Sequence, residues 1–116
     1  MIVCNHTGLC EILNMILSPL MPSFIASKEV QRMPFIGTLS RVLQSLYVES
    51  NPTKEEKEEL LQEIFERQEN IIVDSIPYPP LCVFPEGTTS NGDYLLPFNG
   101  GAFQAMRTVQ PCFVKI

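Results

Sequence analysis

The chain has 116 residues, of which 45% are hydrophobic and 18% are charged. This length and balance indicate a single folded domain and exclude an intrinsically disordered chain. The net charge of −5 comes wholly from residues 49–70, where eight acidic residues outweigh three basic ones. Since no basic surface is predicted elsewhere, we expect no binding to nucleic acid.

The predicted elements alternate between strands and helices along the chain. Strands are expected where short apolar runs occur, at residues 1–4, 23–26, 46–48, 81–84 and 112–114. Helices are expected at residues 8–17, 34–44, 53–68 and 102–106. Residues 28–33 are predicted to form a polar connection. This alternation predicts an α/β fold with a mixed, largely parallel sheet flanked by helices.

The only histidine, His6, lies just before the first predicted helix, and Glu11 follows it by five positions. Apolar residues recur along this helix at Leu9, Ile12, Leu13, Ile16 and Leu17. We expect this stripe to face the core, which puts Glu11 on the opposite stripe and directs it back toward His6. A carboxylate on one ring nitrogen fixes the tautomer and raises the basicity of the imidazole, as a general base requires. The alternative is a structural, hydrogen-bonding histidine.

The four cysteines, Cys4, Cys10, Cys82 and Cys112, have no CxxC spacing. Since no secretory signal precedes them, we expect reduced thiols in a cytosol-facing domain. A zinc site from His6 and three of these thiols is an alternative, but structural zinc sites usually show tighter paired spacings, so no metal is expected. No apolar run has the roughly 20 residues of a membrane span, although the chain could lie against a bilayer.

Residues 84–88 read Phe-Pro-Glu-Gly-Thr and follow an apolar run typical of a buried strand. With His6 and Glu11 in an H-x4-E motif, this block resembles the 1-acylglycerol-3-phosphate and lysophospholipid acyltransferase family of glycerolipid acyltransferases. That family carries an H-x4-D motif, a block that ends in arginine, an FPEGT-like block and a proline-containing strand. The similarity extends over nearly the whole chain and includes residues 109–111 as the fourth block. It implies a single, incomplete acyltransferase domain over residues 1–116, truncated at both ends.

The resemblance implies transfer of a fatty acyl group from acyl-CoA to the hydroxyl of a lysophospholipid or lysophosphatidic acid. His6 would act as general base, Glu11 would orient it, and backbone N–H groups after Thr7 would stabilise the oxyanion. Five residues would hold the acceptor, namely Phe84, Pro85, Glu86, Gly87 and Thr88. Acyl-CoA is then a co-substrate, and no further cofactor is expected. The implied location is a membrane surface, at the endoplasmic reticulum or another endomembrane, with the site on the cytosolic or interfacial side.

One position departs from the family pattern. Ser50 stands where the second block should end in the arginine thought to hold the acceptor phosphate, and a hydroxyl cannot supply a bidentate guanidinium contact. A non-catalytic remnant that binds acyl-CoA or lipid is therefore an alternative function. A thioester hydrolase with Cys10 as nucleophile is another, although a buried cysteine is usually an inert apolar filler.

Overall fold

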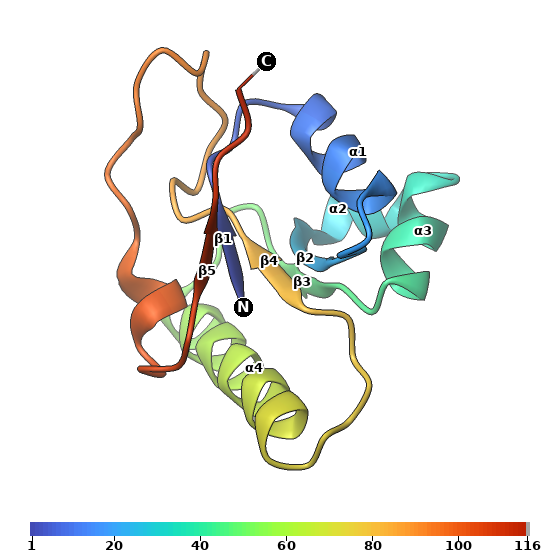
Figure 1. The fold of residues 1–116 in the computed structure, drawn as a ribbon, viewed down its shortest axis with the longest axis vertical. Coiled ribbons are helices and arrows are strands. Elements are labelled where there is room, and N and C mark those ends of the chain that lie inside the picture. The colour runs from blue at the N-terminus through green and yellow to red at the C-terminus, as the bar shows by residue number, and fades with distance from the viewer. Residues whose placement is uncertain (116) are drawn as a thin grey trace.

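The structure is a computed structural model that describes residues 1–115. Its five-stranded sheet has the order β3-β2-β4-β1-β5, and all described strand pairs are parallel (Figure 1). The strands are β1 (Ile2–Cys4), β2 (Ser23–Ser27), β3 (Leu46–Val48), β4 (Leu81–Val83) and β5 (Gln110–Cys112). The helices are α1 (Leu9–Leu17), α2 (Lys28–Arg32), α3 (Ile36–Val42), α4 (Lys54–Ile72) and the 3-10 helix η1 (Gly100–Phe103). The predicted α/β fold is confirmed.

Helices cover both faces of the sheet. The connections that run toward β3 contain α1, α2 and α3, and the connection that runs back from β3 to β4 contains α4. Right-handed crossovers therefore place α4 on the face opposite the other three helices. The core under α1 and α3 contains six buried residues, Ile2, Cys4, Met15, Phe24, Leu43 and Cys82.

The longest helix begins as its sequence predicts. The Thr53 hydroxyl accepts the Glu56 N–H, and the Glu56 carboxylate accepts the Thr53 N–H, which is a complete capping box. The helix ends at Ile72, four residues beyond the predicted Gln68. Arg67, on its inner side, donates to the Ser23 hydroxyl and so ties the helix to β2.

Three local predictions were wrong. The helix expected at residues 102–106 is instead the 3-10 helix Gly100–Phe103. Residues 28–32 form the short helix α2, because lysine, glutamate, glutamine and arginine all favour helix and Pro34 lies just beyond its end. The last strand is Gln110–Cys112 and not residues 112–114. Pro111 lacks an N–H and fits this strand because β5 is the edge of the sheet.

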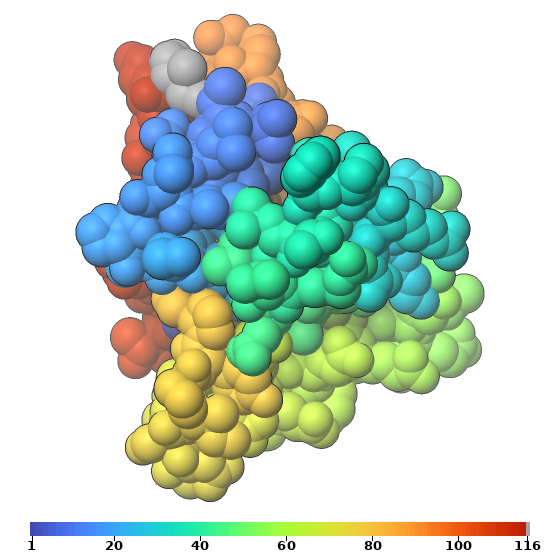
Figure 2. All heavy atoms as spheres, turned by 90° about the vertical axis from the view of Figure 1, so that its right-hand side faces the viewer, coloured from blue at the N-terminus to red at the C-terminus, as the bar shows by residue number. Residues whose placement is uncertain are grey.

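The buried face of α1 also differs from the expectation. Ile12 and Ile16 of the apolar stripe pack against the core as expected, but Leu9, Leu13 and Leu17 are exposed. Glu11 and Met15 are buried instead. The helix is rotated so that Glu11 points inward to hydrogen-bond with the segment at the end of β1, and residues on the far side of the helix then face out. In Figure 2, this outward side of α1 borders the segment that contains α3.

Candidate active site

His6 and Glu11 form a hydrogen-bonded pair at the carboxyl end of the sheet. His6 lies two residues beyond β1, and its Nδ1 is 2.5 Å from Oε1 of Glu11 in the first turn of α1. The predicted direction of the Glu11 side chain toward His6 is therefore observed. The sequence places the two residues in contact because five positions span only the β1–α1 junction and one helical turn.

The Glu11 carboxylate accepts three further hydrogen bonds. Oε1 accepts the N–H groups of Thr7 and Gly8, each at 2.8 Å, and Oε2 accepts the Thr7 hydroxyl at 3.0 Å. Burial alone would raise the pKa of this carboxyl group, but the hydrogen bonds from Gly8, His6 and Thr7 outweigh burial and lower its pKa. Glu11 is therefore a buried anion at neutral pH.

This arrangement defines the chemistry open to the imidazole. A carboxylate can only accept a hydrogen bond, so Nδ1 of a neutral His6 carries the proton and Nε2 has a free lone pair. The His6 ring stacks on Phe84, with centroids 4.3 Å apart and an angle of 19° between the ring planes. Since about a fifth of its side-chain surface is exposed, the imidazole is accessible to a substrate as well as fixed in orientation.

His6 lines a pocket of about 420 Å³ between α1, β2, α2 and α3. The other lining residues are mostly apolar and include Leu9, Ile12, Ile16, Phe24, Met33 and Leu39. This volume lies within the usual range of small-molecule sites, about 300 to 1,000 Å³. The arrangement places the imidazole of His6 on the wall of an apolar cavity.

The second predicted block lies beside the first because β4 pairs directly with β1. Phe84 contacts the His6 ring, Pro85 is buried, and the Glu86 carboxylate accepts the His6 N–H at 2.8 Å. Gly87 and Thr88 are exposed at the turn that follows. Gly87 has a φ of +70°, and a Cβ there would lie 2.7 Å from the Asn99 amide nitrogen, so this turn requires glycine. The structure thus brings both motifs together.

Comparison with known proteins places this site in a family. A family model described as Acyltransferase matches residues 1–115. The chain belongs to the Acyltransferase family. It is 36% identical over 98% of its length to lysophospholipid acyltransferase LPEAT1 of Arabidopsis thaliana, which it covers by 28%. It is 32% identical over 82% of its length to lysophosphatidylcholine acyltransferase 2 of Homo sapiens, covering 16% of that protein.

A bacterial relative extends the comparison. The chain is 30% identical over 92% of its length to the lyso-ornithine lipid O-acyltransferase of Rhodobacter capsulatus, which it covers by 35%. The chain thus spans about a sixth to a third of the length of these acyltransferases. No solved structure matches it.

Ser50 lies just beyond the end of β3, away from the His6–Glu11 pair. Its hydroxyl donates to Glu29 at 3.3 Å, and β3 is separated from β1 by three strand spacings, roughly 14 Å. Arg41, the nearest arginine in sequence on the N-terminal side, donates to the Gln31 carbonyl and the Thr38 hydroxyl and does not line the His6 pocket. Arg41 therefore does not take the place of the missing arginine.

Two further expectations need correction. The Gly8 N–H donates to Glu11, so this amide is not free to stabilise an oxyanion. Cys10 is exposed, not buried as a filler would be, and its thiol makes no hydrogen bond with the described residues. Sequence reasoning also gave no structural role to Asn5, whose side chain hydrogen-bonds both the N–H and the carbonyl of Val114.

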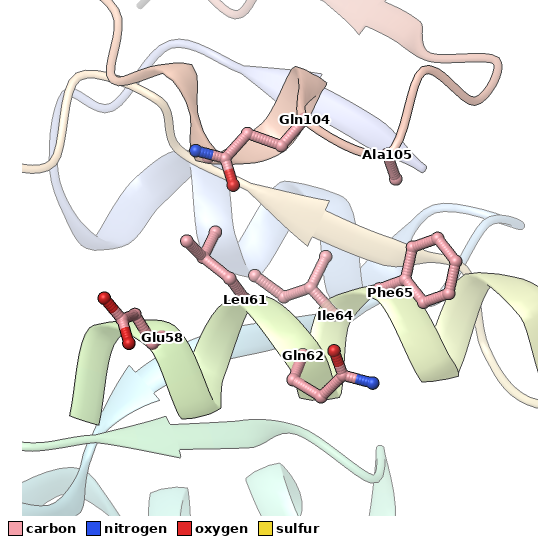
Figure 3. A pocket seen from close by; sticks show the side chains of 8 residues that line it. Glu58, Leu61, Gln62, Ile64, Phe65, Gln104 and Ala105 are labelled. Carbon is pink, nitrogen blue, oxygen red and sulfur yellow. The ribbon is translucent and has the colours of Figure 1, made fainter. Parts of the chain in front are cut away.

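A second hollow lies on the α4 side of the sheet (Figure 3). It has a volume of about 310 Å³ and lies between α4 and the segment around η1, with Leu61, Ile64 and Gln104 on its walls. Its one ionisable side chain is Glu58, and neither a histidine nor a cysteine lines it. The His6 pocket, by contrast, has an imidazole on its wall.

The described residues also bear on metals and membranes. Over residues 1–115, no three histidine, cysteine, aspartate or glutamate side chains are grouped so that they could hold a metal ion. The four cysteines are free thiols. None of the described helices combines the length and the hydropathy that a bilayer crossing requires.

Proposed function

We propose that this chain forms the catalytic part of an acyl-CoA-dependent lysophospholipid acyltransferase. His6 Nε2 takes the proton of the acceptor hydroxyl, and the resulting oxygen nucleophile attacks the thioester carbonyl. The carbon–sulfur bond then breaks, and the imidazolium returns its proton to the departing thiolate of CoA. The supporting observation is the 2.5 Å contact between His6 Nδ1 and the buried Glu11 carboxylate at the edge of an apolar pocket.

The apolar pocket suits the fatty acyl chain. Each methylene group that leaves water contributes about 0.8 kcal/mol, so the pocket can bind the chain without polar contacts. His6 and Phe84 both line this cavity and stack on one another, so a thioester carbonyl bound beside them would sit next to His6 Nε2. No metal or other cofactor is needed for this chemistry, since the thioester is already activated.

The proposed acceptor is a lysophospholipid. The relatives are named for acceptors of this class, and the exposed pair Gly87 and Thr88 lies on the loop that contacts His6. Ser50 favours an acceptor whose phosphate is capped by a further head group over lysophosphatidic acid, because no arginine is present at this position to bind the extra charge.

We also propose that the side of the protein formed by α1, α2 and α3 faces a membrane, such as that of the endoplasmic reticulum, from its cytosolic side. Its exposed apolar residues include Leu13, Leu17, Met33, Phe35, Ile36 and Val42. Helices α2 and α3 together have three bases, Lys28, Arg32 and Arg41, and one acid, Glu29, whereas α4 on the opposite face has seven acids and three bases. This polarity favours contact with anionic lipids and would open the His6 pocket toward the lipid substrates.

The alternative is a non-catalytic remnant that binds acyl-CoA or lipid, and the observation that favours it is the Ser50–Glu29 contact in place of an arginine. The two proposals differ in turnover, since a remnant binds acyl-CoA without transferring its acyl group. A thioester hydrolase that uses the exposed Cys10 is a third possibility, and it would release free fatty acid with no acceptor present.

The test is acyl transfer by the native chain, His6→Ala and Cys10→Ser, measured with radiolabelled acyl-CoA and lysophospholipid. We expect His6→Ala to lower kcat by about 10² to 10⁴, the usual contribution of a general base, with an unchanged circular dichroism spectrum. Cys10→Ser should keep nearly full activity. Near-normal turnover by His6→Ala would refute the proposed base, and loss of activity in Cys10→Ser alone would favour the hydrolase.

A further inference from the structure

The Glu86 carboxylate is committed to the protein backbone. It is 6% exposed, its Oε1 accepts the His6 N–H at 2.8 Å, and its Oε2 accepts the Leu96 N–H at 2.9 Å. No basic side chain among the described residues forms an ion pair with it. A buried carboxylate without a cation is retained only where hydrogen bonds compensate for lost hydration, and here both oxygens are used in that way.

His6 itself belongs to no regular element. It lies between the end of β1 and the start of α1, where no sheet ladder or helix holds its backbone. The loop after β4 replaces that support, since Glu86 accepts the His6 N–H and the Ser90 N–H donates to the His6 carbonyl at 2.9 Å. Phe84 from the same loop stacks on the ring. Figure 1 shows this long connection from β4 leading away toward η1.

We infer that Glu86 is a positioning residue that acts through His6 and does not hold the acceptor. This inference rests on the proposed function of His6 as general base. Glu11 fixes the ring at Nδ1, and Glu86 fixes the main chain from which the ring projects, so that the two carboxylates together determine where Nε2 lies. Misplacement of a catalytic group by about 1 Å can lower the rate by about 10². A buried carboxylate would also repel an acceptor phosphate.

The test is Glu86→Gln in the full 116-residue chain. The glutamine amide keeps one acceptor but directs an NH₂ donor at either the His6 or the Leu96 N–H, so one hydrogen bond must be lost. Asp93→Asn is the matched control, because it removes the same charge from the same loop and, among the described residues, the Asp93 carboxylate hydrogen-bonds only with Asn91. Positioning predicts a kcat lower by about 10- to 100-fold with unchanged KM for the acceptor, and no change in the control.

A second measurement makes the result independent of turnover. Because His6 is the only histidine, ¹⁵N-labelled histidine gives one backbone amide signal and one imidazole in NMR spectra. In the unaltered chain, the His6 amide should exchange slowly with solvent although it lies in no strand or helix. In Glu86→Gln, the NMR signals of this amide and of the ring nitrogens should both shift. If Glu86→Gln does not fold, Glu86→Asp is measured in its place, and a smaller shift of the same signals is expected.

Rapid exchange of the His6 amide in the native chain would overturn the inference. So would a higher KM for the acceptor with unchanged kcat and unmoved His6 signals, which would instead show that Glu86 binds the acceptor. Shifted His6 signals together with full activity of His6→Ala would have a different meaning. The positioning contact would then stand, and the general-base function would fail.

Discussion

Replacement of Glu11 by glutamine removes one charge with little change in shape. The glutamine Oε1 can still accept from His6, Thr7 and Gly8, and its NH₂ can donate to the Thr7 hydroxyl, which accepts as well as donates. Every described hydrogen bond of Glu11 therefore has a counterpart in the variant. The fold should persist, and any loss of activity should report the missing charge.

The magnitude follows from the charge that develops on His6. Once His6 is protonated, its charge and that of Glu11 are centred about 4 Å apart, which is worth about 4 kcal/mol at an effective dielectric constant near 20. A neutral hydrogen bond recovers about 1 kcal/mol of this, so Glu11→Gln should raise the barrier by about 3 kcal/mol and lower kcat between 10² and 10³-fold. Glu11→Asp keeps the charge on a shorter side chain and should lose less.

The assay is steady-state acyl transfer by the native chain and both variants, with thermal unfolding of each as the control for folding. Equal losses in Glu11→Gln and Glu11→Asp would refute the electrostatic argument and show that the side chain matters by its packing. A pH series adds an independent check. Because the pKa of Glu11 is lowered in the folded protein, its ionised carboxylate stabilises the fold fully at a pH above about 4.3, the ordinary pKa of glutamate. This contribution to the unfolding free energy is lost as the pH falls through the lower pKa of the folded state. The difference in unfolding free energy between native and Glu11→Gln protein should therefore shrink in acid.

Two further predictions concern substrate and membrane. Ser50→Arg should lower the KM for lysophosphatidic acid more than the KM for a choline-capped acceptor. The carboxylate of Glu29 competes for the new guanidinium, so the gain in binding free energy should stay below the roughly 1.5 to 3 kcal/mol of a charged hydrogen bond unless Glu29→Gln is added. Equal responses of the two acceptors would show that this position does not contact the phosphate. Leu17 is 84% exposed and lies outside the His6 pocket, and Leu17→Glu should reduce sedimentation of the protein with phosphatidylserine vesicles. Val73→Glu, at the end of α4, should not reduce it. Equally strong binding by both variants would exclude the α1 side as the membrane face.

The sequence alone determined the features that depend on near neighbours. The His6–Glu11 contact needs only a strand end and one helical turn, and the capping box at Thr53 needs only three positions. The strands at residues 2–4, 23–27 and 46–48 followed from short apolar runs for the same reason. Local patterns also carried the family resemblance, since both motifs are contiguous.

Only the tertiary structure decided which distant groups meet. Periodicity predicted an amphipathic α1 whose Ile12 and Ile16 pack on the core, but not the burial of Glu11, which depends on its hydrogen bonds to the segment after β1. The pairing of β1 with β4 brings Glu86 within 2.8 Å of a residue 80 positions earlier. No local pattern encodes that contact, because its partner is a backbone N–H that every residue except proline carries. The choice of strand neighbour, a property of the whole sheet, therefore fixes the position of the proposed base.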